Sequence, residues 1–262
     1  MPSRTSPHCH GRQMNSLLAD LLAALDPTEL AGDVGISPDP WQADLLTSTS
    51  RKILVLCSRQ SGKSTTAALL GLHTALYERG DVLLVSPSQR QSSELFRKLR
   101  DHYAAMPHRP ELVTESATTL EFRAGGRIIS LPGAESTVRG FSGAKAIIVD
   151  EASRVPDSMM ASLRPILATS GGRLIALSTP AGKRGWFYRG WIEGHDWHRI
   201  TITAEQCPRI SPEFLADELA ELGSLLYRQE YLCEFVDDSE ALFPSHLIDA
   251  CFRDDCPSLW PR

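Results

Sequence analysis

A short polar loop that follows an apolar run constrains the fold of this chain more than any other feature. The residues Ile53-Leu54-Val55-Leu56 lead directly into Cys57-Ser58-Arg59-Gln60-Ser61-Gly62-Lys63-Ser64. This order matches the phosphate-loop pattern G-x-x-x-x-G-K-[ST], except that Cys57 replaces the first glycine. Backbone N–H groups of such a loop, with the start of the next helix, hold phosphate groups. The sequence therefore predicts a buried strand that ends in a nucleotide site; the alternative is a chance match on the surface.

An alternation of strand and helix patterns continues from this loop. We expect strands at 53–57, 82–86, 119–122, 127–131, 146–150, 173–178 and 197–203. We expect helices at 16–25, 63–77, 89–103, 157–167, 212–222 and 224–234. This order predicts an α/β fold with a largely parallel sheet covered by helices on both faces, and a hairpin at 119–131.

The chain length and the loosening of the pattern suggest how the chain is organised. Its 262 residues, 42% of them hydrophobic, can form one large α/β domain with appendages. We expect a disordered tail at 1–15, a helix and linker at 16–40, and a core at 41–195. A small lid at 196–236 and a tail at 237–262 complete the expected order.

Charge and cysteine content exclude few binding partners or cellular compartments. The net charge is −5, so no overall positive field indicates nucleic acid, although a local basic patch could still hold it. Six scattered cysteines without a short repeating framework favour a reduced, cytoplasmic protein. No apolar run approaches the roughly 20 residues of a membrane span.

The phosphate loop supplies the first set of candidate residues. We expect Lys63 to reach the β- and γ-phosphates and the Ser64 hydroxyl to hold Mg²⁺. Around them, the nucleotide contacts are expected from Ser58, Gln60, Ser61, Gly62 and Thr65.

Two adjacent acids form the second set. The apolar strand that ends at Val149 is followed by Asp150 and Glu151, which places both carboxylates at the edge of the sheet where ligands bind. We expect Asp150 to hold Mg²⁺ and Glu151 to polarise an attacking water. Such acids can instead simply favour a helix N-terminus. The second acid favours hydrolysis, because a small-molecule kinase needs no water activator.

Three further positions carry open alternatives. Ser178 and Thr179 end an apolar strand and could sense the γ-phosphate, or form an ordinary turn. Arg139 lies in a glycine-rich loop and could be an arginine finger, or a solvated or DNA-facing residue. Gln42 could read an adenine edge, or only begin a helix beside Trp41.

Together these motifs resemble the ATPase motor domain of the large terminase subunit of tailed bacteriophages and prophages. The resemblance rests on Trp41-Gln42, the loop 58–64, Val138-Arg139-Gly140, Ile148-Val149-Asp150-Glu151-Ala152, Ser178-Thr179-Pro180, and the late segments 227–231 and 234–235. The resemblance covers residues 40–236. No single motif is specific to this family, but the combination of the motifs is.

The resemblance implies a P-loop ATPase of the ASCE, RecA-like type that uses ATP and Mg²⁺. It implies packaging of double-stranded DNA into a procapsid, as a ring on the portal protein, with a small terminase subunit as partner, in the host cytoplasm. It assigns catalysis to Glu151 and a charge-sensing role to Arg59. Arg139 matches a position proposed to reach a neighbouring subunit, and Ser178 and Thr179 match the coupling motif.

The C-terminus departs from the family pattern. Large terminases continue into a nuclease domain, whereas Asp249, Asp254 and Asp255 lie in a segment too short to build one, so DNA cleavage is not expected. Two alternatives remain: a helicase-like DNA-remodelling ATPase, and a nucleotide-binding remnant or adaptor that does not hydrolyse ATP.

Overall fold

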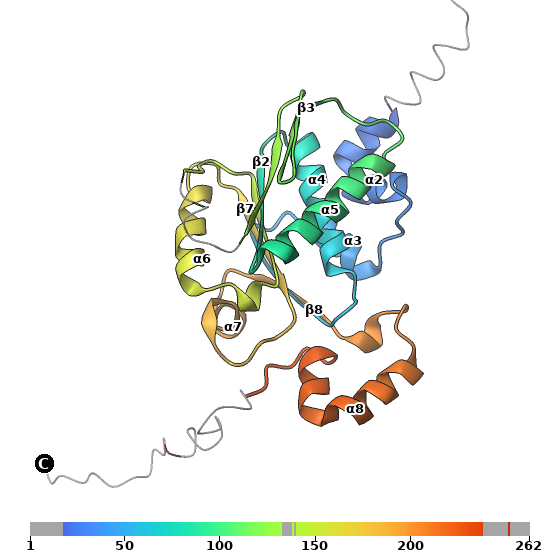
Figure 1. Ribbon diagram of the computed structural model, residues 1–262, viewed down its shortest axis with the longest axis vertical. Helices are drawn as coiled ribbons and strands as arrows, with labels where there is room; N and C mark the ends of the chain where they lie inside the picture. The colour runs from blue at the N-terminus through green and yellow to red at the C-terminus, as the bar shows by residue number, and fades with distance from the viewer. Residues whose placement is uncertain (1–17, 133–137, 139, 238–250, 252–262) are drawn as a thin grey trace, which may run out of the picture.

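One sheet with helices on both faces organises the molecule (Figure 1). The computed structural model describes residues 18–132, 138, 140–237 and 251. In these ranges the strands are β1 (Lys52–Cys57), β2 (Asp81–Ser86), β3 (Leu112–Glu115), β4 (Thr119–Phe122), β5 (Arg127–Pro132), β6 (Ala146–Asp150), β7 (Arg173–Ser178) and β8 (His198–Ile202). They form an eight-stranded sheet in the order β3-β4-β5-β2-β6-β7-β1-β8.

The sheet is mostly parallel, as the sequence predicts. From β5 to β8 every neighbouring pair is parallel. The hairpin expected at 119–131 is present as the antiparallel pair β4 and β5, and β3 extends it on the outer side. Strand β7 lies between β6 and β1, a position that matters for the site below.

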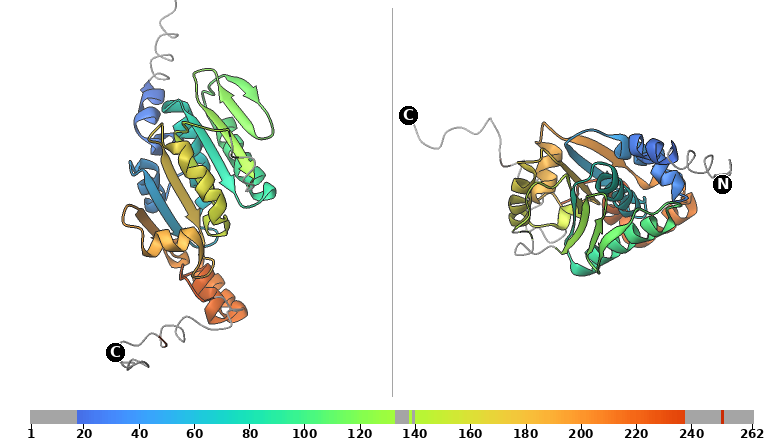
Figure 2. Two further views of the ribbon diagram at one scale, coloured as in Figure 1. Left: turned by 90° about the vertical axis from the view of Figure 1, so that its left-hand side faces the viewer. Right: turned by 90° about the horizontal axis from the view of Figure 1, so that it is seen from above.

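Helices cover the two faces of the sheet in separate groups (Figures 1 and 2). Residues 18–25 are helical, and the further helices are α2 (Pro27–Asp33), α3 (Pro40–Thr47), α4 (Lys63–Tyr77), α5 (Gln89–Ala105), α6 (Asp157–Leu163), α7 (Gly185–Ile192) and α8 (Pro212–Glu230). Helices α4 and α5 lie on one face, with α2 and α3 packed beside α4, and α6 and α7 lie on the other. Short 3₁₀ turns at Ala152–Arg154 (η2), Arg164–Leu167 (η3) and Ala204–Gln206 (η4) connect elements.

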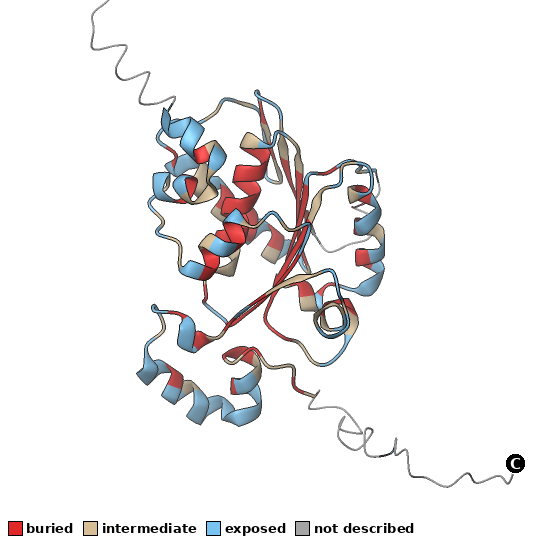
Figure 3. Cartoon of the chain, turned by 180° about the vertical axis from the view of Figure 1, so that it is seen from behind, coloured by how far each residue is buried: buried red, intermediate tan, exposed pale blue. Residues whose placement is uncertain are grey.

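Alternate residues of each central strand enter opposite hydrophobic cores. Ile53 and Val55 belong to the cluster under α4 and α5, whereas Leu54 and Leu56 belong to the cluster under α6 and α7. All four are at most 2% exposed. This arrangement explains the continuous apolar run in the sequence, because a strand covered on both faces has no solvated side (Figure 3).

Three details differ from the sequence-based expectation. Residues 198–202, which we expect in the lid, form β8, the edge strand that pairs in parallel with β1. Helices α2, α3 and α7 have no counterpart among the expected elements, because each has only seven or eight residues. The second expected lid helix, 224–234, ends at Glu230 within α8, whereas the expected break between the two lid helices is present at Gly223, whose backbone is non-helical (φ 73°, ψ 166°).

Candidate nucleotide-binding site

The candidate residues meet at the carboxyl ends of three neighbouring strands. The phosphate loop, residues 57–64, joins β1 to α4. Asp150 ends β6 and Glu151 follows it, and Ser178 ends β7 and Thr179 follows it. Ligands of open α/β sheets bind at this edge, because loops and helix N-termini converge there. The parallel register therefore brings the separate motifs of the sequence into one place.

The backbone of the phosphate loop requires Gly62. Its φ is +95°, a conformation that side chains rarely adopt, and a Cβ atom there would lie 2.7 Å from Nε2 of Gln42. Ser61 supports the bend, because its Oγ donates a hydrogen bond to the Ser58 carbonyl at 2.9 Å. Gln60 also has a positive φ of 59°. Gln42 thus packs against the phosphate loop at Gly62.

Lys63 and Glu151 face each other across the site. Lys63 Nζ lies 2.6 Å from Glu151 Oε1, and the two side chains are 12% and 18% exposed. Burial disfavours the charge of Lys63, but the neighbouring acidic groups, including the carboxylates of Glu151 and Asp150, outweigh it and raise the lysine pKa. Glu151 has a left-handed backbone (φ 52°), which is uncommon for a non-glycine residue and occurs often at functional sites.

Ser64 and Asp150 form a second contact that suits a cation. Ser64 Oγ donates a hydrogen bond to Asp150 Oδ2 at 2.9 Å. Burial raises the pKa of Asp150, opposed by nearby Lys63. A buried carboxylate beside a hydroxyl fits Mg²⁺, which takes one or two protein oxygens and completes its shell with water and phosphate. Within the described ranges, no group of three or more His, Cys, Asp or Glu residues gathers as a metal cage.

Ser178 and Thr179 are joined to the residues that follow the acids. Ser153 Oγ lies 2.7 Å from Ser178 Oγ, and it also donates to the Thr179 carbonyl at 2.8 Å. Arg154 Nη1 lies 3.1 Å from Glu151 Oε2 and 3.4 Å from Thr179 Oγ1. These contacts join the end of β6 to the end of β7.

Arg59 connects the phosphate loop to α8. Its Nε donates to Glu230 Oε2 at 2.5 Å, and its backbone N–H donates to the Glu230 carbonyl at 3.2 Å. Although burial alone would raise the pKa of Glu230, hydrogen bonds from Arg59 and Gln229 lower it. The carboxylate therefore stays charged and holds the arginine.

Cys57 is a structural residue at the place of the usual glycine. It is fully buried as the last residue of β1, and burial raises the pKa of its thiol to about 12. The thiol is consequently neutral at physiological pH and acts as a small apolar side chain.

A pocket of about 430 Å³ includes Lys63 and Glu151. Its lining is formed by Arg59, Gln60, Lys63, Gln91, Glu151, Arg154 and Thr179. This volume lies within the range of ordinary ligand pockets. The sequence-based candidates do not include Gln91 and Arg154. Arg154 could have been found from the sequence, because it lies three residues after Glu151. The other described candidates lie outside this lining: Gln42, Ser58, Ser61, Gly62, Ser64, Thr65, Asp150 and Ser178. Arg139 lies outside the described residues.

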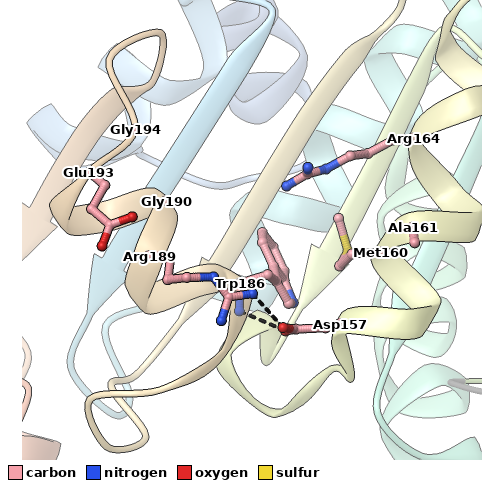
Figure 4. A pocket seen from close by; sticks show the side chains of 9 residues that line it. All are labelled: Asp157, Met160, Ala161, Arg164, Trp186, Arg189, Gly190, Glu193 and Gly194. Carbon is pink, nitrogen blue, oxygen red and sulfur yellow. Dashed lines mark hydrogen bonds and ion pairs between the residues drawn. The ribbon is translucent and has the colours of Figure 1, made fainter.

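A second pocket, of about 410 Å³, opens between α6 and α7 on the far face of the sheet (Figure 4). Arg189 of α7 lies at this pocket and is paired with Asp157. Other basic side chains that a local basic patch could use are also paired: Arg97 with Glu94 and Asp101, Arg100 with Glu115, and Lys183 with Asp237. Of the helices that the structure describes, none has the length and apolar character to cross a membrane.

The fold and the site define a P-loop nucleotide-binding domain. Residues 54–249 match the family described as "Terminase large subunit, T4likevirus-type, N-terminal". The match covers most of the sequence, and the chain belongs to this family. Large terminase subunits of Thermus phage G20c and Thermus virus P23-45 are each 23% identical to it over 250 residues, covering 80% of this chain. The chain spans about half (51%) of the length of these relatives.

Solved structures show the same fold. The large terminase ATPase domain of Thermus phage P74-26 superposes with a TM-score of 0.67 at 20% identity, covering 80% of this chain and 97% of that one. The large terminase of another thermophilic bacteriophage, solved in complex with ADP, gives 0.61 at 15% identity, covering 76% and 54%. The HK97 bacteriophage large terminase gives 0.61 at 16% identity, covering 76% and 51%. These similarities confirm the P-loop fold that the sequence predicts.

Proposed function

We propose that this chain hydrolyses ATP and that the hydrolysis drives movement of double-stranded DNA into a procapsid. The observation that carries the proposal is the pair Lys63 and Glu151, held 2.6 Å apart in the pocket at the carboxyl edge of the sheet. A cation for phosphate and a carboxylate for water are the two charges that the reaction needs in one place. Membership in the terminase family supports the assignment.

The residues of the site divide the chemistry between them. The backbone of the phosphate loop and Lys63 bind the β- and γ-phosphates. Ser64 and Asp150 would hold Mg²⁺, which when bound neutralises charge on the phosphates. Glu151 orients water for attack on the γ-phosphorus and accepts its proton, and ADP leaves. Arg154 beside Glu151 and Arg59 beside Gln60 add positive charge to the pocket wall.

Two routes would carry the loss of the γ-phosphate to the rest of the molecule. One passes from Glu151 through Ser153 to Ser178 and Thr179, and the other from Arg59 to Glu230 at the end of α8. We infer that α8 is part of a lid whose position changes with the nucleotide. The further partners of this proposal are the portal protein, the small terminase subunit and copies of the same chain in a ring. In the ring Arg139 would reach a neighbouring site, in the host cytoplasm.

Replacement of Glu151 tests hydrolysis. The Glu151→Gln variant keeps the size of the side chain but removes the base, so the ATPase rate should fall by about 10²–10⁴-fold while ATP binding persists. Glu193→Gln, an exposed substitution at the end of α7, is the matched control and should retain full activity. Equal ATP turnover by wild type and Glu151→Gln would contradict the role of Glu151 in hydrolysis and would favour an adaptor that does not hydrolyse ATP.

The DNA part of the proposal needs a separate assay. We expect double-stranded DNA to stimulate ATP hydrolysis, and ATP-dependent packaging into procapsids when the chain is supplied with its portal protein and small terminase subunit. Strand displacement without a procapsid would instead identify a helicase-like enzyme.

A further inference from the structure

Arg209 is placed beside the nucleotide site by a turn that is anchored on both sides. It lies between η4 and α8, where Cys207 is 1% exposed and Ile210 packs against two hydrophobic clusters. The Ile210 N–H donates to the Cys207 carbonyl at 3.0 Å and closes the turn. Because the neighbours of Arg209 are fixed in this way, the direction of its side chain is set by the fold.

The guanidinium of Arg209 joins two elements that contact the nucleotide site. Its Nη1 and Nη2 lie 3.0 and 2.6 Å from Oδ1 and Oδ2 of Asp39, which makes a bidentate pair. Nη2 also donates to the Ser61 carbonyl at 3.1 Å. One side chain thus ties the residue before α3 to the phosphate loop.

Asp39 also holds the side chain of Gln42 in place. The Asp39 backbone N–H donates to Gln42 Oε1 at 2.8 Å, so the side-chain amide is held with its Nε2 toward Gly62. Gln42 is only 5% exposed. The contacts run from Arg209 to Asp39 to Gln42, and separately from Arg209 to Ser61.

We propose that Arg209 is a positioning residue for nucleobase selection, which fixes Gln42 relative to the phosphate loop. This role rests on the proposed function, because it requires a nucleotide in the pocket. A glutamine amide discriminates adenine by pairing a donor and an acceptor with the base edge. Such a pair selects only if the distance between the amide and the bound phosphates is constant. Arg209 contacts Asp39, which holds Gln42, and Ser61 of the phosphate loop.

The test compares ATP and GTP binding by titration calorimetry in Arg209→Ala, Arg209→Lys and wild type. We expect the preference for ATP over GTP to fall by about tenfold in Arg209→Ala, the loss of one good bidentate contact. Arg209→Lys keeps the positive charge but loses the planar guanidinium that binds Asp39 with two hydrogen bonds, so it should not restore the preference for ATP over GTP. The turnover number at saturating ATP should change little. Arg123→Ala, which removes an exposed ion pair with Glu111 far from the site, is the matched control and should leave the preference unchanged.

Asp39→Ala supplies the second arm. If Arg209 acts through Asp39, the double variant should lose no more selectivity than Arg209→Ala alone. An unchanged ATP-to-GTP ratio in Arg209→Ala would overturn the role while the proposed function stands, as would additive effects in the double variant. A wild-type chain that binds neither nucleotide would overturn the proposed function itself.

Discussion

Arg59 and Glu230 are separated by most of the chain and joined by a 2.5 Å contact between Nε and Oε2. The arginine belongs to the phosphate loop and the glutamate to the last turn of α8. Since the arginine side chain is 58% exposed and lines the nucleotide pocket, it can turn from Glu230 to a phosphate without unfolding anything.

This contact predicts a response of α8 to nucleotide. Saturation with a non-hydrolysable ATP analogue should draw Arg59 toward the phosphates and loosen the end of the helix. Hydrogen–deuterium exchange of residues 224–232 should then rise in wild type and stay constant in Arg59→Ala. Slower exchange in wild type on binding would contradict the prediction.

The same contact predicts a pH dependence of stability. Because the pKa of Glu230 is lower in the folded state, its stabilising contribution is present above the pKa of an unfolded glutamate, about 4.3. It is lost as the pH falls through the folded pKa. Urea unfolding from pH 7 to 3 should show wild type more stable than Glu230→Gln near neutrality, by about 1 kcal/mol or less because Arg59 is exposed. The difference should vanish in acid, and Glu111→Gln, from an exposed pair, should show no comparable difference.

Gly62 should tolerate no side chain. In Gly62→Ala the new Cβ would combine an unfavourable φ of +95° with a clash against Gln42, so we expect about 1–3 kcal/mol of destabilisation and impaired ATP binding. Gly32→Ala is the control, because Gly32 lies in α2 with open space around it. That variant should be neutral or slightly more stable. Equal stability of the two variants would contradict the strain at Gly62.

Restoring the usual glycine at the start of the loop should not help. Cys57 is a buried strand residue whose φ is not positive, so Cys57→Gly removes packing and adds backbone freedom. We expect a loss of about 1–2 kcal/mol in urea unfolding and unchanged ATP affinity. Cys251→Ser, at an exposed position, should leave stability unchanged. Tighter ATP binding by Cys57→Gly would show that the cysteine impairs the loop.

The parallel core could be predicted because its signals are local. The phosphate loop and the acids at 150–151 each follow an apolar strand, and the sheet register then brings them together without further information. The hairpin was equally readable from Gly125-Gly126 between two short strands. The edge strand β8 was assigned to the lid because its half-buried pattern resembles that of any peripheral segment.

The contacts that tune the site could not be predicted, because they join residues distant in sequence. Nothing in a single arginine within a Pro- and Ser-containing turn indicates that Arg209 reaches Asp39, and no motif links Arg59 to Glu230. Such pairs depend on how α8 and α3 lie against the sheet. The hydrophobic pattern of a short helix such as α3 is too weak to predict where that helix packs. The residue roles assigned to the loop, the acids, Ser178, Thr179 and Gln42 stay predictions until the variants are measured.

The position of β7 between β6 and β1 makes that strand a spacer. Two strand spacings, about 10 Å in all, separate the backbone that carries Lys63 from the backbone that carries Glu151. The separation between the backbones that carry Lys63 and Glu151 therefore depends on a strand that supplies neither of these charged residues. Ala176 and Leu177 anchor this strand in the two opposite cores, so residues far from any ligand keep β6 and β1 two strand spacings apart.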